Sequence, residues 1–155
     1  MEEHARLMRL IDANLNRARE ALRVVEDAFR FIHDDSQAQA ELKSMRHALL
    51  KYESLVDPKG GELLANRASD ADVGAFVNPA SEMTKPNLQS VVRANLRRAQ
   101  EALRCLEEYG KLIDTQAAGI AKRLRFDSYS FEKKHGLASV EHPEGEGDAA
   151  HETND

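Results

Sequence analysis

The sequence predicts an all-α protein: a four-helix bundle built from two tandem helix-pair repeats, with approximate two-fold symmetry and a long crossover. Aromatic residues make up only 5% of the chain and charged residues 32%, a balance that is typical of helical bundles. Apolar residues recur at steps of three and four along four segments. Residues 13–32 return at 94–113 with 11 of 20 positions identical, and the identities include polar residues.

The first repeat, residues 7–56, is predicted to contain two helices. The apolar seam of the first helix consists of Ile11, Leu15, Ala18, Leu22, Val25, Phe29 and Ile32. Ser36 is expected to cap the second helix, with Gln39 completing a capping box. The seam of this helix consists of Ala38, Leu42, Met45, Leu49, Tyr52 and Val56. Pro58 and the glycines that follow it are expected to end the helix.

The second repeat, residues 90–134, follows the same plan. Its first helix is expected to start near Pro86, because proline suits a first helical turn. The seam of this helix consists of Val92, Leu96, Ala99, Leu103, Leu106 and Ile113. Gly110 stands where repeat one has Phe29, which predicts a weak or kinked last turn. Thr115 is the candidate cap of the last helix, whose seam consists of Ala117, Ala121, Leu124, Ser128 and Phe131.

The crossover, residues 57–89, contains three prolines and three glycines, and only residues 62–67 could form a short helix. Irregular segments of this length inside a domain are usually functional loops or linkers. We expect the crossover to dock on the bundle through its apolar residues, Leu63, Leu64, Val73, Phe76 and Val77. Residues 135–155 carry six acidic residues and no Lys or Arg, which predicts a disordered acidic tail beyond a 1–134 domain.

Charge and composition exclude several classes of protein. The net charge is -5, but without the six acidic residues of the tail 22 basic residues face 21 acidic ones. The residues outside the tail are therefore almost neutral overall, which excludes a strongly basic nucleic-acid-binding domain. A single cysteine, Cys105, fits a reducing compartment. No signal peptide and no apolar run of about 18 residues is present, so we expect a cytoplasmic protein without membrane contact. The chain has no GxxxxGK[ST] motif, which excludes a P-loop kinase.

The repeated polar residues form a shoulder beside each apolar seam. On a helical wheel, Asn14 and Arg17 lie together on one side of the first helix, and Asn95 and Arg98 lie in the same place on the third. One interpretation is that the two-fold axis brings both shoulders to a shared anion site, because guanidinium groups bind phosphate or carboxylate bidentately. The alternative is that each arginine pairs with a glutamate of the opposite repeat. The pattern leaves both open.

The crossover and the second helix offer further candidates. Asp72 and Gly74 predict a turn whose carboxylate could meet Mg²⁺ or a basic side chain, and a turn without chemistry fits equally well. Arg67 and Lys85 are cations of the same segment. Arg46, near the middle of the second helix, could face the same site.

The motifs at 11–32, 43–47, 72–74 and 94–112 together resemble a known family. This family is the alternative hydroxymethylpyrimidine-phosphate kinase, a domain found N-terminal to some bacterial thiamine-phosphate synthases and also alone, and we expect a stand-alone domain here. The resemblance covers about residues 7–134. It implies transfer of a phosphoryl group from ATP, with Mg²⁺, to 4-amino-5-hydroxymethyl-2-methylpyrimidine phosphate, which yields the diphosphate for thiamine biosynthesis.

The resemblance also suggests roles for the candidate residues. Arg17 and Arg98 would stabilise the transferring phosphoryl group, and Asp72 would be a catalytic residue and the magnesium ligand. Substrate or phosphate contacts are expected from Asn14, Asn95, Arg67, Lys85, Gly74 and Arg46. Two positions depart from the family's pattern, with Lys85 in place of the usual Arg and Ala75 in place of the usual Thr. Lysine is the poorer clamp for phosphate, because it lacks the planar fork of arginine.

Two other functions are compatible with the sequence. One is a non-catalytic helical module that binds a partner in thiamine synthesis. The other is a different all-helical enzyme with an arginine-lined anion site, such as a mutase acting on a dicarboxylate. The expected partners are a small-molecule pyrimidine phosphate and a nucleotide, with no nucleic acid and no membrane, and a homo-oligomer is compatible with the pattern.

Overall fold

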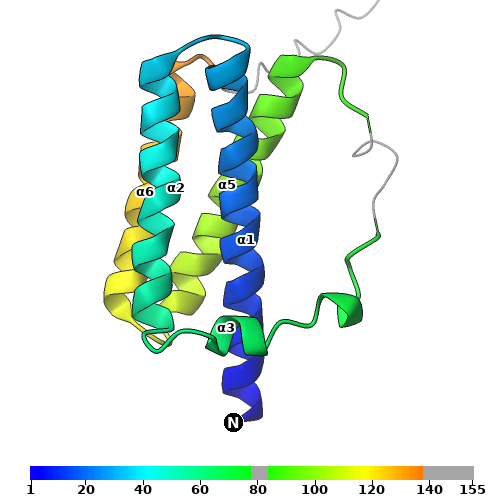
Figure 1. Cartoon of the computed structure of the whole chain (residues 1–155), viewed down its shortest axis with the longest axis vertical. Helices are drawn as coiled ribbons and strands as arrows, with labels where there is room; N and C mark the ends of the chain where they lie inside the picture. Colours follow the sequence, from blue (N-terminus) through cyan, green and yellow to red (C-terminus); the bar gives the residue numbers. More distant parts are fainter. Residues whose placement is uncertain (78–83, 138–155) are drawn as a thin grey trace, which may run out of the picture.

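Four long helices form the body of the protein in this computed structural model, which describes residues 1–77 and 84–137 (Figure 1). They are α1 (Glu2–Phe31), α2 (Ser36–Val56), α5 (Leu88–Gly110) and α6 (Thr115–Lys134). Each packs on two antiparallel neighbours: α1 and α6 both lie against α2 and α5. A short helix α3 (Glu62–Ala65) and a 3-10 turn η1 (Ser69–Ala71) lie between α2 and α5. The described ranges contain no strand, so the all-α prediction is confirmed.

The predicted seams form the core. Every seam residue of α2 and α6 is buried, and in α1 and α5 the buried run stops only where the helix itself ends. Ile32 is therefore 59% exposed, because α1 finishes at Phe31. Fully burying a leucine such as Leu22 or Leu103 stabilises the fold by about 1.5–3 kcal/mol. No described helix has both the length and the apolar character that crossing a membrane requires.

The helix caps differ from the prediction by one residue. Asp35, not Ser36, caps α2 by accepting the Ala38 N–H at 2.9 Å. Asp114, not Thr115, caps α6 in the same way at 2.8 Å. An aspartate also places a negative charge at the positive end of the helix dipole, which favours it over a hydroxyl. Helix α5 begins at Leu88, where Asn87 caps it by accepting the Ser90 N–H, so Pro86 lies before the helix.

Two buried ion pairs occupy equivalent places in the two repeats. In repeat one, Arg46 Nε donates to Glu26 Oε2 at 2.9 Å, and in repeat two Arg125 Nη2 donates to Glu107 Oε2 at 2.7 Å. Burial alone would raise the pKa of Glu26, but hydrogen bonds from Arg46 and Gln39 lower it below its ordinary value. These pairs join the two helices of each repeat and are part of the scaffold.

Gly110 is present because a neighbouring tyrosine needs the space. A Cβ atom on Gly110 would lie 2.6 Å from the Tyr52 hydroxyl, which donates to the Leu106 carbonyl at 2.7 Å. At the equivalent place in repeat one, Phe29 and Phe131 meet edge to face with their ring centroids 5.3 Å apart. The glycine therefore admits a tyrosine at one end of the bundle. Helix α5 also ends at Gly110, whereas α1 continues to Phe31, two residues past the equivalent Phe29.

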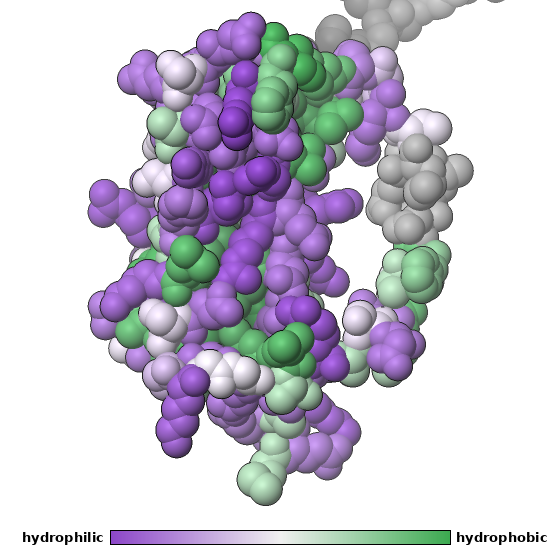
Figure 2. Space-filling model, in the orientation of Figure 1, coloured by the Kyte–Doolittle hydropathy of each residue, from purple (hydrophilic) through white to green (hydrophobic). Residues whose placement is uncertain are grey.

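The crossover docks on the bundle only at its start. Leu63 is buried, and its N–H donates to Asp57 Oδ2 at 3.1 Å. The other apolar residues expected to dock are exposed; they are Leu64, Val73, Phe76 and Val77. Figure 2 shows open space between the bundle and the part of the crossover beyond η1. That expectation was wrong for these four residues: Leu64 is exposed on α3 itself, and the other three follow Arg67 and Ala68, which bond to α1. From residue 138 onward the predicted acidic tail lies outside the described residues, while Leu137, which was assigned to it, is buried.

Candidate functional site

A groove of about 660 Å³ lies between the first half of α1 and the start of the crossover, beside η1. Its lining residues are Arg6, Arg9, Leu10, Asp12, Ala13, Asn14, Asn16, Arg17, Arg67, Ala68, Ser69 and Asp72. The α1 members recur at spacings of three and four, which places them on one face of the helix. The α1 seam turns to the core, so this polar face is left for the crossover to cover.

The crossover is held to α1 by a bidentate ion pair. Arg67 Nε donates to Asp12 Oδ2 and Arg67 Nη2 donates to Asp12 Oδ1, both at 2.7 Å. The Asp12 side chain is 9% exposed and the Arg67 side chain 42%. These hydrogen bonds raise the pKa of Arg67 further above its already high value. Arg9 Nη2 also donates to the Ala68 carbonyl at 3.1 Å, so two α1 side chains hold consecutive crossover residues.

The groove carries an excess of positive charge. Four arginines and two aspartates line it, and one of the arginines, Arg6, is paired with Glu2 of the same helix. Arg17 is exposed and forms no ion pair or hydrogen bond with any described residue, whereas Arg67 is paired with Asp12. Arginine has five N–H donors, and Arg67 uses two of them on Asp12. The groove therefore keeps guanidinium donors that an anion can bind.

Asp72 lies at the rim of the groove in the turn that the sequence predicted. Its Oδ1 accepts the Gly74 N–H at 3.0 Å, so Gly74 supports the carboxylate through its backbone. Within the described ranges no three His, Cys, Asp or Glu side chains form a potential metal cluster. Magnesium in phosphoryl-transfer sites is usually held by one or two carboxylates together with substrate phosphates. The residues present fit that arrangement, with Asp72 as the carboxylate.

The structure brings together some of the predicted residues and not others. Asn14, Arg17, Arg67 and Asp72 all line the groove. Asn95, Arg98 and Lys85 do not, and Arg46 is held by Glu26 inside the bundle. Thus the groove is built from repeat one and the crossover, rather than shared between the two repeats.

The repeated asparagines have a structural role in both copies. Asn14 Nδ2 donates to the Leu10 carbonyl at 3.0 Å, and Asn95 Nδ2 donates to the Val91 carbonyl at 2.9 Å. The alternative in which Arg17 and Arg98 pair with glutamates of the opposite repeat is not seen among the described residues. The duplication of the asparagine follows from this backbone contact, and Asn14 alone also reaches the groove.

Several groove residues escaped the sequence analysis, and they are Arg6, Arg9, Asp12, Asn16 and Ser69. One signal was present, since position 12 departs from the duplication. Repeat two has Arg93 where repeat one has Asp12, directly before the repeated Ala-Asn-Leu. A charge reversal directly before a stretch of identical residues indicates a residue that serves only one of the copies.

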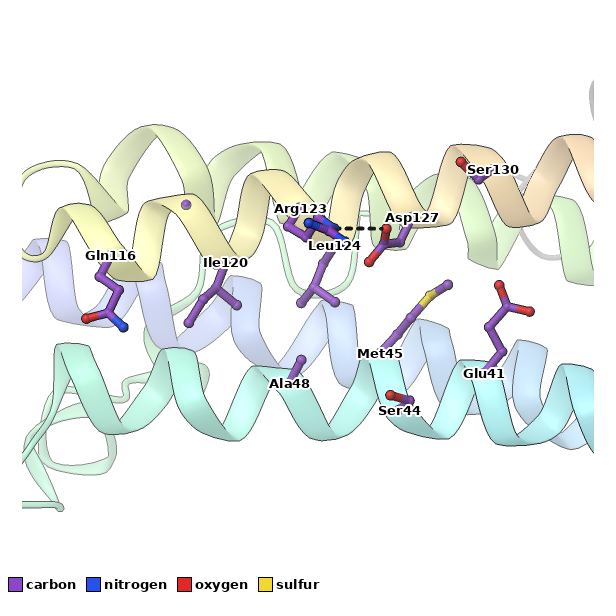
Figure 3. A pocket seen from close by; sticks show the side chains of 11 residues that line it. Glu41, Ser44, Met45, Ala48, Gln116, Ile120, Arg123, Leu124, Asp127 and Ser130 are labelled. Atoms are coloured by element: carbon purple, nitrogen blue, oxygen red, sulfur yellow. Dashed lines mark ion pairs between the residues drawn. The ribbon is translucent and has the colours of Figure 1, made fainter.

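A second hollow, of about 750 Å³, lies between α2 and α6 (Figure 3). Met45, Ile120 and Leu124 give it an apolar lining. Its arginine, Arg123, pairs with Asp127 on the same helix at 3.4 Å. The arginine of this hollow is paired with a carboxylate, whereas the groove beside α1 also contains Arg17, which has no partner among the described residues. The groove beside α1 is therefore the better candidate for an anionic ligand.

Comparison with known proteins supports the family resemblance of the sequence. The sequence model of the ThiD2 family matches residues 9–134. Thiamine-phosphate synthase of Thermosynechococcus vestitus is 44% identical over 84% of the chain and 36% of its own length. The proteins of the same name from Rhodopirellula baltica and Synechocystis sp. are 38% and 40% identical over 83% and 81% of the chain.

The chain spans only about a third of the length of these relatives, 34% and 35% in the last two. No solved structure matches it. The family match runs through both repeats and the crossover between them. The chain therefore belongs to the ThiD2 family.

Proposed function

We propose that this chain phosphorylates 4-amino-5-hydroxymethyl-2-methylpyrimidine phosphate to the diphosphate, using ATP and Mg²⁺. The family and its thiamine-phosphate synthase relatives associate the chain with thiamine biosynthesis. The observation that carries the proposal is the groove, in which four arginines and only two aspartates surround a space of about 660 Å³.

The chemistry requires positive charge more than a base. An oxygen of the acceptor phosphate attacks the γ-phosphorus of ATP, and the bond from that phosphorus to the bridging oxygen breaks as ADP leaves. A phosphate monoester has its second pKa near about 6, so the attacking oxygen is already ionised at neutral pH. The main barrier is repulsion between two polyanions, which cations offset by electrostatic stabilisation and positioning.

The groove residues can divide these tasks. Arg17 has no protein partner among the described residues and can bind a phosphate bidentately. Arg67 is fixed at the groove by Asp12 and retains free N–H donors. Asp72, at the rim, is the residue that would hold Mg²⁺, which would neutralise charge on the phosphates. Asn14 and Ser69 add neutral polar groups to the lining.

The test is an assay of the purified chain with the pyrimidine phosphate, ATP and Mg²⁺, in which ADP and the diphosphate product are resolved separately. The proposal predicts equal amounts of both products, and loss of turnover in Asp72→Asn with helicity unchanged. ADP without diphosphate would reveal only ATP hydrolysis. Absence of both products from a folded chain would contradict the kinase.

One observation favours a second candidate, a non-catalytic binding module. Val73, Phe76 and Val77 are 98%, 95% and 76% exposed on the crossover, and contiguous exposed apolar side chains often mark an interaction surface. Such a module would bind its partner without nucleotide. Substituting all three residues by serine would abolish binding of the partner. The kinase proposal instead predicts that the same variant still forms ADP and diphosphate from ATP.

A further inference from the structure

The duplicated helices differ in charge at two positions whose side chains bond to the crossover: Arg9 corresponds to Ser90, and Asp12 corresponds to Arg93. Asp12 precedes the repeated Ala-Asn-Leu of α1, and Arg93 precedes the same residues of α5. Arg67, the partner of Asp12, belongs to the segment that follows the first helix pair. An arginine at position 12 would repel Arg67, so the aspartate determines which copy the crossover can join.

The Asp12–Arg67 pair differs from the scaffold pairs in its exposure. Arg46 and Arg125, held by Glu26 and Glu107, have side chains 22% and 11% exposed, so little of either guanidinium is accessible to a ligand. The Arg67 side chain is 42% exposed and lines the groove, although Asp12 beneath it is 9% exposed. A buried carboxylate thus holds one edge of a guanidinium whose remaining N–H donors are accessible.

We infer that Asp12 is a positioning residue for anion binding: it holds the Arg67 guanidinium at the groove so that Arg67 and Arg17 bind the same phosphate group. The carboxylate accepts from Nε and Nη2 and leaves the Nη1 side of the fork for the ligand. This orientation removes rotamer freedom from Arg67 before the anion arrives, which strengthens binding without adding a contact. The inference rests on the proposed function only for the identity of the phosphate.

The test measures pyrophosphate binding to the full chain by titration calorimetry. Asp12→Asn keeps the shape of the side chain and leaves the residue at position 67 unsubstituted. We expect about tenfold weaker pyrophosphate binding, the size typical of losing a charge-assisted hydrogen bond. Arg67→Lys keeps the charge and loses the fork, and we expect a similar loss. Glu107→Gln removes a buried carboxylate outside the groove and is the matched control, with affinity unchanged in its folded fraction.

A charge swap separates positioning from simple docking. The double variant D12R/R67D restores an ion pair and keeps the net charge of the groove, and the equivalent position of α5 already carries an arginine. A docking role alone predicts that the swap recovers pyrophosphate binding together with the melting temperature. The positioning role predicts that thermal stability recovers while binding stays at least tenfold weaker.

The outcomes separate this inference from the kinase proposal. Asp12-dependent pyrophosphate binding without diphosphate product would support the inference and contradict the kinase. Turnover and pyrophosphate affinity that are both unchanged in Asp12→Asn would support the kinase and overturn the inference. Should Asp12→Asn fail to fold, Arg67→Lys decides, because wild-type affinity in that variant overturns the inference.

Discussion

The polar shoulders of α1 and α5 began as copies and differ in what surrounds them. Both keep an asparagine that bonds to the carbonyl four residues earlier, and both keep an exposed arginine, Arg17 or Arg98, without a described protein partner. Only the first shoulder has Asp12 and the crossover opposite it. Duplication therefore produced both helix pairs, but only the first pair has Asp12, which bonds to the crossover, so the groove forms once.

The other shoulder has an unsatisfied group where the first has an ion pair. Arg93 Nε, at the position equivalent to Asp12, is buried and has no hydrogen-bond partner among the described residues. The Glu26–Arg46 and Glu107–Arg125 pairs, by contrast, are present in both copies. Features that hold a helix pair together are conserved between the repeats, and features that meet the crossover are not.

The largest expected effect compares Arg17→Ala with Arg98→Ala. Because Arg17 lines the groove and Arg98 does not, we expect kcat/KM for the pyrimidine phosphate to fall about 100-fold or more in the first variant and less than about threefold in the second. Steady-state kinetics on both purified proteins gives the comparison. Equal losses would restore the shared site that the repeated sequence first suggested.

The scaffold pairs should respond alike in the two repeats. Glu26→Gln and Glu107→Gln each leave a largely buried arginine without its carboxylate, and we expect each to lower the free energy of unfolding by about 2–4 kcal/mol. Urea denaturation followed by circular dichroism measures both values. A large loss of unfolding free energy in one variant and none in the other would show that the two ion pairs do not contribute equally to stability.

Gly110 provides a smaller contrast with Phe29. Gly110→Ala places a methyl group 2.6 Å from the Tyr52 hydroxyl, and we expect a loss of about 1–3 kcal/mol from overpacking. Tyr52→Phe removes the hydroxyl, so the double variant should be less destabilised than the sum of the two single variants. Strict additivity in the denaturation data would mean that the glycine serves another purpose.

The smallest expected effect is on pH dependence. Because the pKa of Glu26 is lower in the folded protein than its ordinary 4.5, the unfolded chain binds this proton more readily. Glu26 therefore contributes stability above pH 4.5, and the contribution is lost as the pH falls through the folded pKa. Urea midpoints between about pH 6 and pH 3 should decline less steeply in Glu26→Gln than in the wild type.

The helices were predictable because their signal is local. Apolar residues at steps of three and four located all four helices, and those seams make up most of the core, which also contains residues outside them such as Met8, Ala21 and Ala102. The caps were misplaced by one residue because Asp35 and Ser36, or Asp114 and Thr115, are adjacent residues that can all cap a helix. Sequence alone does not decide which of two neighbouring capping residues lies outside the first turn.

The groove was only half predictable because it depends on contacts distant in sequence. Asn14 and Arg17 were found from the repeat, and Asp72 and Arg67 from the composition of the crossover. The Asp12–Arg67 pair joins residues 55 positions apart, and no periodic pattern shows where the crossover meets α1. Arg98 was expected at the site because it repeats Arg17, and Lys85 because its charge fits phosphate, but neither repetition nor charge brings a side chain to a groove.

The most direct test of the groove is a crystal structure of the chain with the pyrimidine phosphate bound. We predict that its phosphate lies within hydrogen-bonding distance of both Arg17 and Arg67, with the Asp12–Arg67 pair intact beneath it. A phosphate bound at Arg98, or between the two repeats and away from Arg67, would contradict the account.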